Sequence, residues 1–184
     1  MVKLSTAAVL LGLTAGAALP APACAQERTV PPQAIDPSWL RVDTATKTAT
    51  FELIAGLTGL NGALNFNGFR DGGLTLEVPL GWTVVMNFRN HDGMLPHSAE
   101  VIHDAHPLPV QPVTPAFPKA FTVRLNEGIP SEGRDDLRFI ADKGGSYLIF
   151  CGVPGHGAAG MWIRLTVSES FRTPSLAATP AGGH

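Results

Sequence analysis

Short stretches of alternating apolar and polar residues run through the middle of the chain. In 74–78, for example, Leu74, Leu76 and Val78 alternate with polar neighbours. A period of two is typical of a β-strand with one buried face. Stretches of strand character occur at 48–54, 74–78, 82–88, 98–102, 137–140, 145–150 and 161–167. Because turn residues separate them and no convincing helix intervenes, we predict a single-domain, all-β sandwich.

Two of these strands are predicted to form a hairpin, and a longer segment is predicted to be irregular. The stretches 74–78 and 82–88 are joined by Pro79-Leu80-Gly81, which favours a turn. The segment 104–119 carries five prolines, which cannot donate hydrogen bonds to a β-ladder. Long excursions of this kind are often functional. A purely connecting role is the alternative.

The N-terminal region has the pattern of an export signal. Lys3 precedes an uncharged, mostly apolar run over 7–19, and Ala23-Cys24-Ala25 supplies small residues at the cleavage positions. We expect cleavage after Ala25, which makes 1–25 a signal peptide. An uncleaved membrane anchor and a lipid-modified Cys24 are the alternatives. The apolar run is shorter than the about 20 residues that a spanning helix needs.

Composition divides the remaining chain into three parts. The polar segment 26–38 is expected to be a linker or N-terminal arm, and 39–168 holds all the predicted strands. The segment 169–184, rich in Thr, Ser, Pro, Ala and Gly, is expected to be a disordered tail. With 184 residues, 45% hydrophobic and 15% charged, the chain suits one globular domain. Its net charge of -2 and lack of Lys/Arg clusters argue against a nucleic-acid partner.

The cysteine count leaves one thiol to explain. Cleavage of the signal would remove Cys24 and leave Cys151 as the only cysteine of the mature chain. A lone cysteine in an exported protein cannot form an internal disulfide. Cys151 is therefore free, paired with another molecule, or a metal ligand.

The residues around Cys151 favour the metal ligand. Cys151 directly follows an apolar predicted strand and begins a loop rich in glycine. His156 and then Met161 follow in this loop at intervals of five residues. The glycines allow the loop to turn its three donors toward one point. Thiolate, imidazole and thioether together suit copper in both oxidation states. A blue-copper site has two histidines, one cysteine and a weak axial methionine, so one further histidine is required.

His97 is the best candidate for the missing ligand. It stands at the start of a predicted strand, after Pro96, which favours extended backbone in the preceding residue. His91 is the main competitor, although it lies in a turn and turns usually face solvent. The remaining histidines flank the proline-rich excursion or lie in the tail: His103, His106 and His184.

At these residues the chain resembles the cupredoxin family, and most closely its sulfocyanin and rusticyanin branch. The resemblance rests on the segment 151–156 with Met161, and on His97-Ser98 upstream, and it covers roughly 64–167. It implies a cupredoxin-like Greek-key sandwich that binds one copper. The implied ligands are His97, Cys151, His156 and Met161, with methionine axial. Because Ser98 directly follows His97, we also expect it to tune the copper through hydrogen bonding near the Cys151 sulfur. A strand residue that faces solvent is the alternative for Ser98.

The function that follows is one-electron transfer without catalysis. Four protein ligands leave no open position for a substrate, whereas catalytic metal sites normally keep one. We therefore expect a monomeric, periplasmic or secreted carrier that exchanges electrons with redox proteins, such as cytochromes or respiratory oxidase complexes. Membrane association is expected only if the N-terminal segment stays uncleaved. Copper storage or delivery is the alternative function. A multicopper enzyme would need a His-x-His pair or a Cys-His dipeptide, and the sequence has neither.

Overall fold

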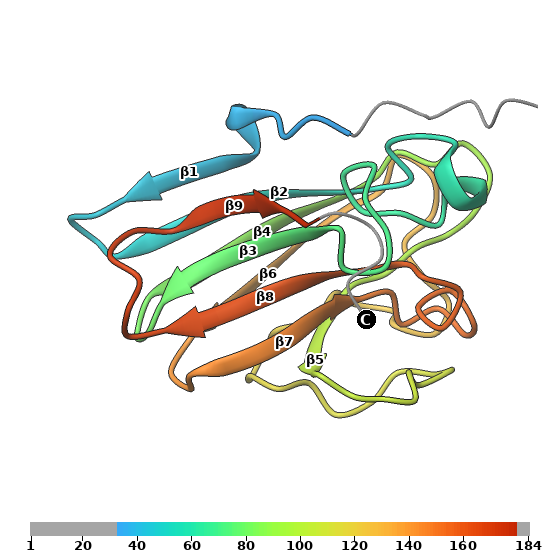
Figure 1. Ribbon diagram of the computed structural model, residues 1–184. Coiled ribbons are helices and arrows are strands. Elements are labelled where there is room, and N and C mark those ends of the chain that lie inside the picture. The colour runs from blue at the N-terminus through green and yellow to red at the C-terminus, as the bar shows by residue number, and fades with distance from the viewer. Residues whose placement is uncertain (1–32, 180–184) are drawn as a thin grey trace, which may run out of the picture. The chain divides into compact units, whose positions relative to one another are not determined.

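The computed structural model describes residues 33–179, and within them strands dominate (Figure 1). The predicted signal peptide and most of the predicted arm lie outside this range. The elements are η1 Pro37–Trp39, β1 Leu40–Asp43, β2 Thr48–Ala55, η2 Leu60–Ala63, β3 Leu74–Pro79, β4 Thr83–Asn90, β5 Glu100–His103, β6 Arg134–Ile140, β7 Gly145–Phe150, β8 Trp162–Ser168 and β9 Ser175–Ala178. In the described part of the chain, no helix is long and apolar enough to cross a membrane.

The strands form two sheets that enclose a common core. One sheet has four strands in the order β1-β2-β4-β6, and the other has five in the order β5-β7-β8-β3-β9. Phe51 and Leu53 of β2, Met86 of β4 and Leu165 of β8 are among the fully buried residues between them. The prediction of an all-β sandwich is therefore confirmed. Along β2 and β4 every second residue is buried, which is the pattern expected when one face of a sheet covers the core.

The predicted hairpin is wrong, because its two strands lie in different sheets. β3 pairs with β8 and β9, whereas β4 pairs with β2 and β6. The connecting turn shows where the chain changes sheet. Leu80 N–H donates to the carbonyl of Ser168 at the end of β8, and Gly81 N–H donates to Ala141 just beyond β6. Each side of the turn is thus attached to a different sheet.

The structure also differs from the expected disordered tail over the residues that it describes there. Ser175–Ala178 form β9, which pairs antiparallel with β3 through the register Leu74↔Ala178 to Glu77↔Ser175. The Ser175 hydroxyl donates to the Glu77 carboxylate at 2.6 Å. Ordered structure therefore continues past 168, and β9 forms one edge of the five-stranded sheet beside β3.

The loops after β4 and β7 meet at the same end of the sandwich (Figure 1). The first of these loops contains His97 and the second contains Cys151, His156 and Met161. The proline-rich excursion reaches the second loop, because the Gly155 N–H donates to the Val110 carbonyl at 2.9 Å. This end of the fold therefore brings together the candidate metal ligands.

Candidate metal centre

The loop between β7 and β8 is held closed by its own backbone. Cys151 N–H donates to the Met161 carbonyl, and Met161 N–H donates to the His156 carbonyl, both at 3.1 Å. His156 N–H in turn donates to the Val153 carbonyl at 3.0 Å. Gly160, with φ of +99°, has a backbone conformation that favours glycine. These bonds fix the three candidate donors of the loop relative to one another.

His97 is held by an isolated bridge to a neighbouring segment. His97 N–H donates to the Ile129 carbonyl at 3.1 Å, and Ile129 N–H donates to the His97 carbonyl at 2.7 Å. Gly128 precedes this bridge with φ of +76°, and a Cβ atom there would lie only 2.9 Å from the backbone nitrogen of His97. The close approach explains why glycine occupies this position.

The structure brings His97, Cys151 and His156 to one point. Their ligand atoms all lie within 4.8 Å of one another, and Cys151 Sγ is 3.8 Å from His156 Nδ1. These separations resemble those of donors that share one metal ion at about 2.0–2.3 Å each. The two imidazole rings lie 5.2 Å apart, centre to centre. His97 and Cys151 are fully buried, whereas His156 is partly exposed.

One buried nitrogen of this cluster lacks a partner. His97 Nδ1 makes no hydrogen bond to any residue that the structure describes, although buried polar atoms are normally satisfied. The other ring nitrogen, Nε2, lies 2.8 Å from the Asp92 carboxylate. This carboxylate favours the tautomer with the proton on Nε2, so the Nδ1 lone pair is free to bind a metal. The donor set of two imidazoles and a thiol fits copper.

Asp92 was not identified from the sequence. It lies in the same turn as His91, where the pattern of residues indicated only a solvent-facing turn. In the structure Asp92 is buried, and its other oxygen accepts the Met94 N–H at 2.9 Å. Burial acts to raise the pKa of Asp92, but hydrogen bonds from His97 and the backbone outweigh it and lower the pKa. Asp92 therefore remains ionised and orients the His97 ring.

Burial also sets the protonation of the three donors. It lowers the pKa of both His97 and His156 below the usual range, which favours the neutral imidazoles that bind metal. Burial raises the pKa of the Cys151 thiol to about 11, although hydrogen bonds from Ser98 and Val153 act in the opposite direction. Because the thiolate is the metal-binding form, a metal that binds here must displace a proton.

Met161 and Ser98 lie at the edges of this cluster. Met161 is fully buried and its backbone is bonded to both Cys151 and His156. The Ser98 hydroxyl donates to the Leu125 carbonyl at 2.8 Å and accepts the Gly152 N–H at 3.1 Å. Ser98 thus links the segment after Cys151 to a separate loop.

The competing histidines lie elsewhere. His91 has a side chain that is 45% exposed, and its Nδ1 lies 3.7 Å from the Glu132 carboxylate. His103 packs against Tyr147, and His106 lies beside Asp104. None of these three belongs to the cluster of ligand atoms. His184 falls outside the described residues.

A buried carboxyl group lies close to the centre without belonging to it. Glu100 of β5 is fully buried, and its Oε1 accepts the Val113 N–H of the proline-rich excursion at 3.4 Å. Its Oε2 has no hydrogen-bond partner within residues 33–179. Burial raises the pKa of Glu100 to about 7. The negative charge of Glu100 also raises the pKa of the Cys151 thiol, so the two groups interact electrostatically.

Comparison with known proteins identifies relatives of the chain. A profile of the sulfocyanin (SoxE) domain matches residues 37–178. Sulfocyanin from Sulfolobus acidocaldarius is 26% identical over 142 residues, which cover 71% of this chain and 69% of the relative. Rusticyanin from Thiobacillus ferrooxidans has the same fold, with a TM-score of 0.51 and 24% identity over 71% of this chain and 88% of that one. A crystal structure of variant rusticyanin gives a TM-score of 0.52 and 26% identity, covering 70% and 86%.

Proposed function

The chain belongs to the sulfocyanin (SoxE) family, and from this premise we propose that it is an exported carrier of single electrons. Proteins of this cupredoxin family bind one copper and transfer electrons. The ligands that we propose are His97, Cys151, His156 and Met161. Bound copper supplies a one-electron couple between Cu(I) and Cu(II).

The observation that carries the proposal is the cluster of three donors, in which His97 Nδ1 has no hydrogen-bond partner within the part of the chain that the structure describes. His97 Nδ1, Cys151 Sγ and His156 Nδ1 lie close enough to share one ion in the loops that carry them. The ring of His97 is held by Asp92 and the backbone of the loop by its own hydrogen bonds. A rigid ligand set favours fast electron transfer, because little has to move when the charge of the metal changes.

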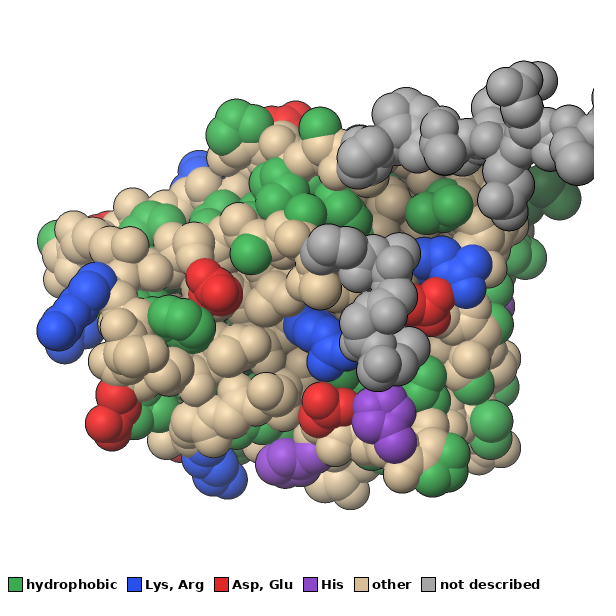
Figure 2. All heavy atoms as spheres, in the orientation of Figure 1, with side chains coloured by type: hydrophobic (Ala, Val, Ile, Leu, Met, Phe, Trp, Pro, Cys, Tyr) green, Lys and Arg blue, Asp and Glu red, His purple; other side chains and the backbone are tan. Residues whose placement is uncertain are grey.

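The surface around His156 suits brief contact with a redox partner. His156 is partly exposed, and exposed apolar residues lie in the same loop and in the loop that leads to His97: Pro154, Ala158, Ala159, Met94 and Leu95. Met94 is 89% exposed. Figure 1 shows these loops at the right-hand end of the molecule, and Figure 2, in the same orientation, shows hydrophobic side chains along that end. A small apolar patch is sufficient for a weak, transient interface.

Voltammetry of the copper-loaded protein tests this function. We expect a reversible one-electron wave, together with rapid reduction by a cytochrome in stopped-flow mixing. A storage or delivery protein would instead lose copper readily to a competing chelator. If the chelator removes copper as fast as electrons are exchanged, the carrier function is wrong.

Export and the identity of the partners are the finer parts of the proposal. The signal pattern over 1–25 supports export to the periplasm or the cell exterior. The partners that we propose are cytochromes or respiratory oxidase complexes, and the carrier itself is proposed to be a monomer. Membrane attachment would follow only if the N-terminal segment remained in place.

Replacement of Ser98 by alanine is expected to lower the reduction potential without loss of copper. Ser98 acts to lower the pKa of the Cys151 thiol, which favours the charged form of the thiol, and the Ser98 hydroxyl accepts the N–H of the next residue, Gly152. Stabilised thiolate charge donates less to Cu(II), which favours Cu(I) and raises the potential. Voltammetry at one pH measures the difference, and Ser146→Ala on the exposed part of β7 is the control. An unchanged or higher potential in Ser98→Ala would remove Ser98 from the tuning of the metal.

A further inference from the structure

Two arginines lie side by side on the outer face of the four-stranded sheet, away from the candidate metal ligands. In the register of this sheet, Arg89 of β4 is opposite Ile54 of β2 on one side and Arg134 of β6 on the other. Directly opposed residues of neighbouring strands point to the same face. The preceding residue of β4, Phe88, points into the core, so Arg89 and Arg134 point outward.

Neither arginine of this pair forms an ion pair within the described part of the chain, although the carboxylates of Asp36 and Glu52 line the same cleft. The arginine ion pairs found there are Arg41–Glu52, Arg70–Asp71 and Arg164–Asp104. Like charges directly opposite each other across two strands destabilise a sheet. An anion that lies between the two guanidinium groups would remove this repulsion. Binding of an anion would therefore reduce the electrostatic repulsion between the two arginines.

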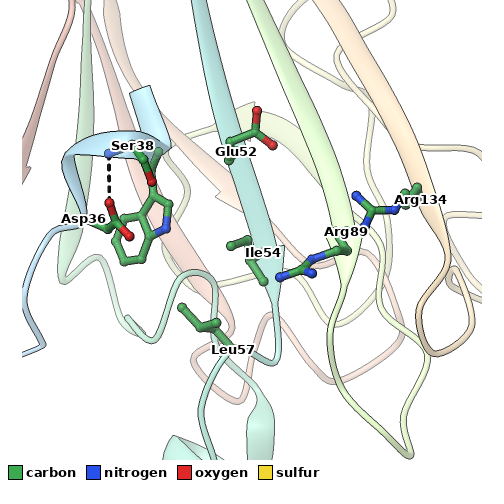
Figure 3. Close-up of a pocket in the computed structure, with 8 residues that line it drawn as sticks. Asp36, Ser38, Glu52, Ile54, Leu57, Arg89 and Arg134 are labelled. Atoms are coloured by element: carbon green, nitrogen blue, oxygen red, sulfur yellow. Dashed lines mark hydrogen bonds between the residues drawn. The ribbon is translucent and has the colours of Figure 1, made fainter. Parts of the chain in front are cut away.

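The pair opens onto a cleft of about 460 Å³ (Figure 3). The other residues that line the cleft are Asp36, Ser38, Trp39, Glu52, Ile54 and Leu57. In Figure 3 the Arg89 side chain extends toward Ile54 and Leu57, and Arg134 extends toward Arg89. This volume lies within the range typical of small-molecule sites, about 300–1,000 Å³.

The two acidic groups of the cleft are engaged by other donors. Asp36 accepts the Ser38 N–H at 2.8 Å. Glu52 Oε1 accepts from Arg41 at 3.2 Å and from the Asn87 amide at 2.7 Å. Arg89 and Arg134 therefore remain the donors available to a ligand, and Trp39, Ile54 and Leu57 supply an apolar wall.

We propose that this cleft binds a small organic carboxylate. Its carboxylate group lies between Arg89 and Arg134, since the planar guanidinium group matches a carboxylate through paired hydrogen bonds. Its apolar body lies against the wall formed by Trp39, Ile54 and Leu57. None of these residues belongs to the metal cluster, so the site is separate from electron transfer.

Titration of the copper(I)-loaded protein with phenylacetate tests the proposal. We expect saturable shifts of the Arg89 and Arg134 side-chain N–H signals and of the Trp39 indole signal in proton–nitrogen NMR spectra. Arg134→Gln and Arg89→Gln should each weaken binding about tenfold or more, because each removes a charge-assisted pair of hydrogen bonds. Arg138→Gln is the matched control, since Arg138 lies outward on the same strand but opposite Val85, outside the cleft.

Two further ligands separate the contributions of charge and apolar contact. Uncharged 2-phenylethanol and inorganic sulfate are each expected to bind at least about tenfold more weakly than phenylacetate. Equal binding of the alcohol would exclude a role for the arginines, and equal binding of sulfate would exclude an organic ligand. The proposal is also overturned if no shift saturates, or if Arg138→Gln weakens binding as much as Arg134→Gln does.

Discussion

Replacement of Cys151 by alanine is expected to abolish the blue colour of the copper-loaded protein completely. The colour of a blue-copper site comes from charge transfer between the cysteine thiolate and Cu(II), and Cys151 is the only cysteine among residues 33–179. Its Sγ is fully buried beside both imidazoles, so no other thiolate of the described chain can take its place. Visible absorption of the two proteins after copper loading measures the effect.

Two histidine variants make this result specific to the proposed ligand set. His97→Ala should greatly perturb the spectrum, because it removes the buried Nδ1, which has no hydrogen-bond partner among residues 33–179. His91→Ala should leave the spectrum unchanged, because His91 is largely exposed and lies beside Glu132. Blue colour that survives in Cys151→Ala, or that depends on His91 rather than His97, would contradict the assignment.

The strands of the sandwich were predictable where their pattern is local. β2 and β4 alternate half-buried and buried residues along eight positions each, and this period is visible in the sequence alone. β1 and β9 carry no such signal, because both are edge strands that are mostly half-buried or exposed. Pairing partners were not predictable either, since the alternation along β3 is the same whether β4 or β8 lies beside it.

The candidate site was predictable where its residues lie close together in the sequence. Cys151, His156 and Met161 occur in a single loop, and their spacing favoured a metal site. The preference for His97 over His91 rested on the place of His97 at the start of a predicted strand and on the resemblance to a family. Asp92 and the Arg89–Arg134 pair depend on contacts that the sequence does not specify: the fold of one turn, and the register of two strands. Each of these contacts appears only once the tertiary structure is known.

Glu100 is expected to make the stability of the protein fall as pH rises from about 4.5 to about 7. Burial raises the pKa of this carboxyl from its ordinary value of 4.5 to about 7 in the folded protein. In this pH window the unfolded chain releases the proton while the folded protein retains it. The free energy of unfolding therefore decreases through the window and stays low above it.

The expected size of this effect is about 3 kcal/mol, since each unit of pKa difference corresponds to about 1.4 kcal/mol. The structure explains why the charge is unfavourable. The only hydrogen bond to the carboxyl is a 3.4 Å contact from Val113 N–H, and Oε2 has no partner in the described chain. Glutamine has nearly the same shape and can still accept the Val113 N–H, but it cannot ionise.

Urea unfolding of the wild-type protein and Glu100→Gln, in the same metal state, should reveal this contribution between pH 4 and 8. The difference between the two proteins cancels every group that titrates in both. We expect Glu100→Gln to be no more stable than wild type at pH 4, and more stable by up to about 3 kcal/mol at pH 8. Glu169→Gln, at an exposed position after β8, should show no such trend. If the difference between wild type and Glu100→Gln stays constant from pH 4 to 8, Glu100 does not ionise within this window and its burial is not the source of pH-dependent stability.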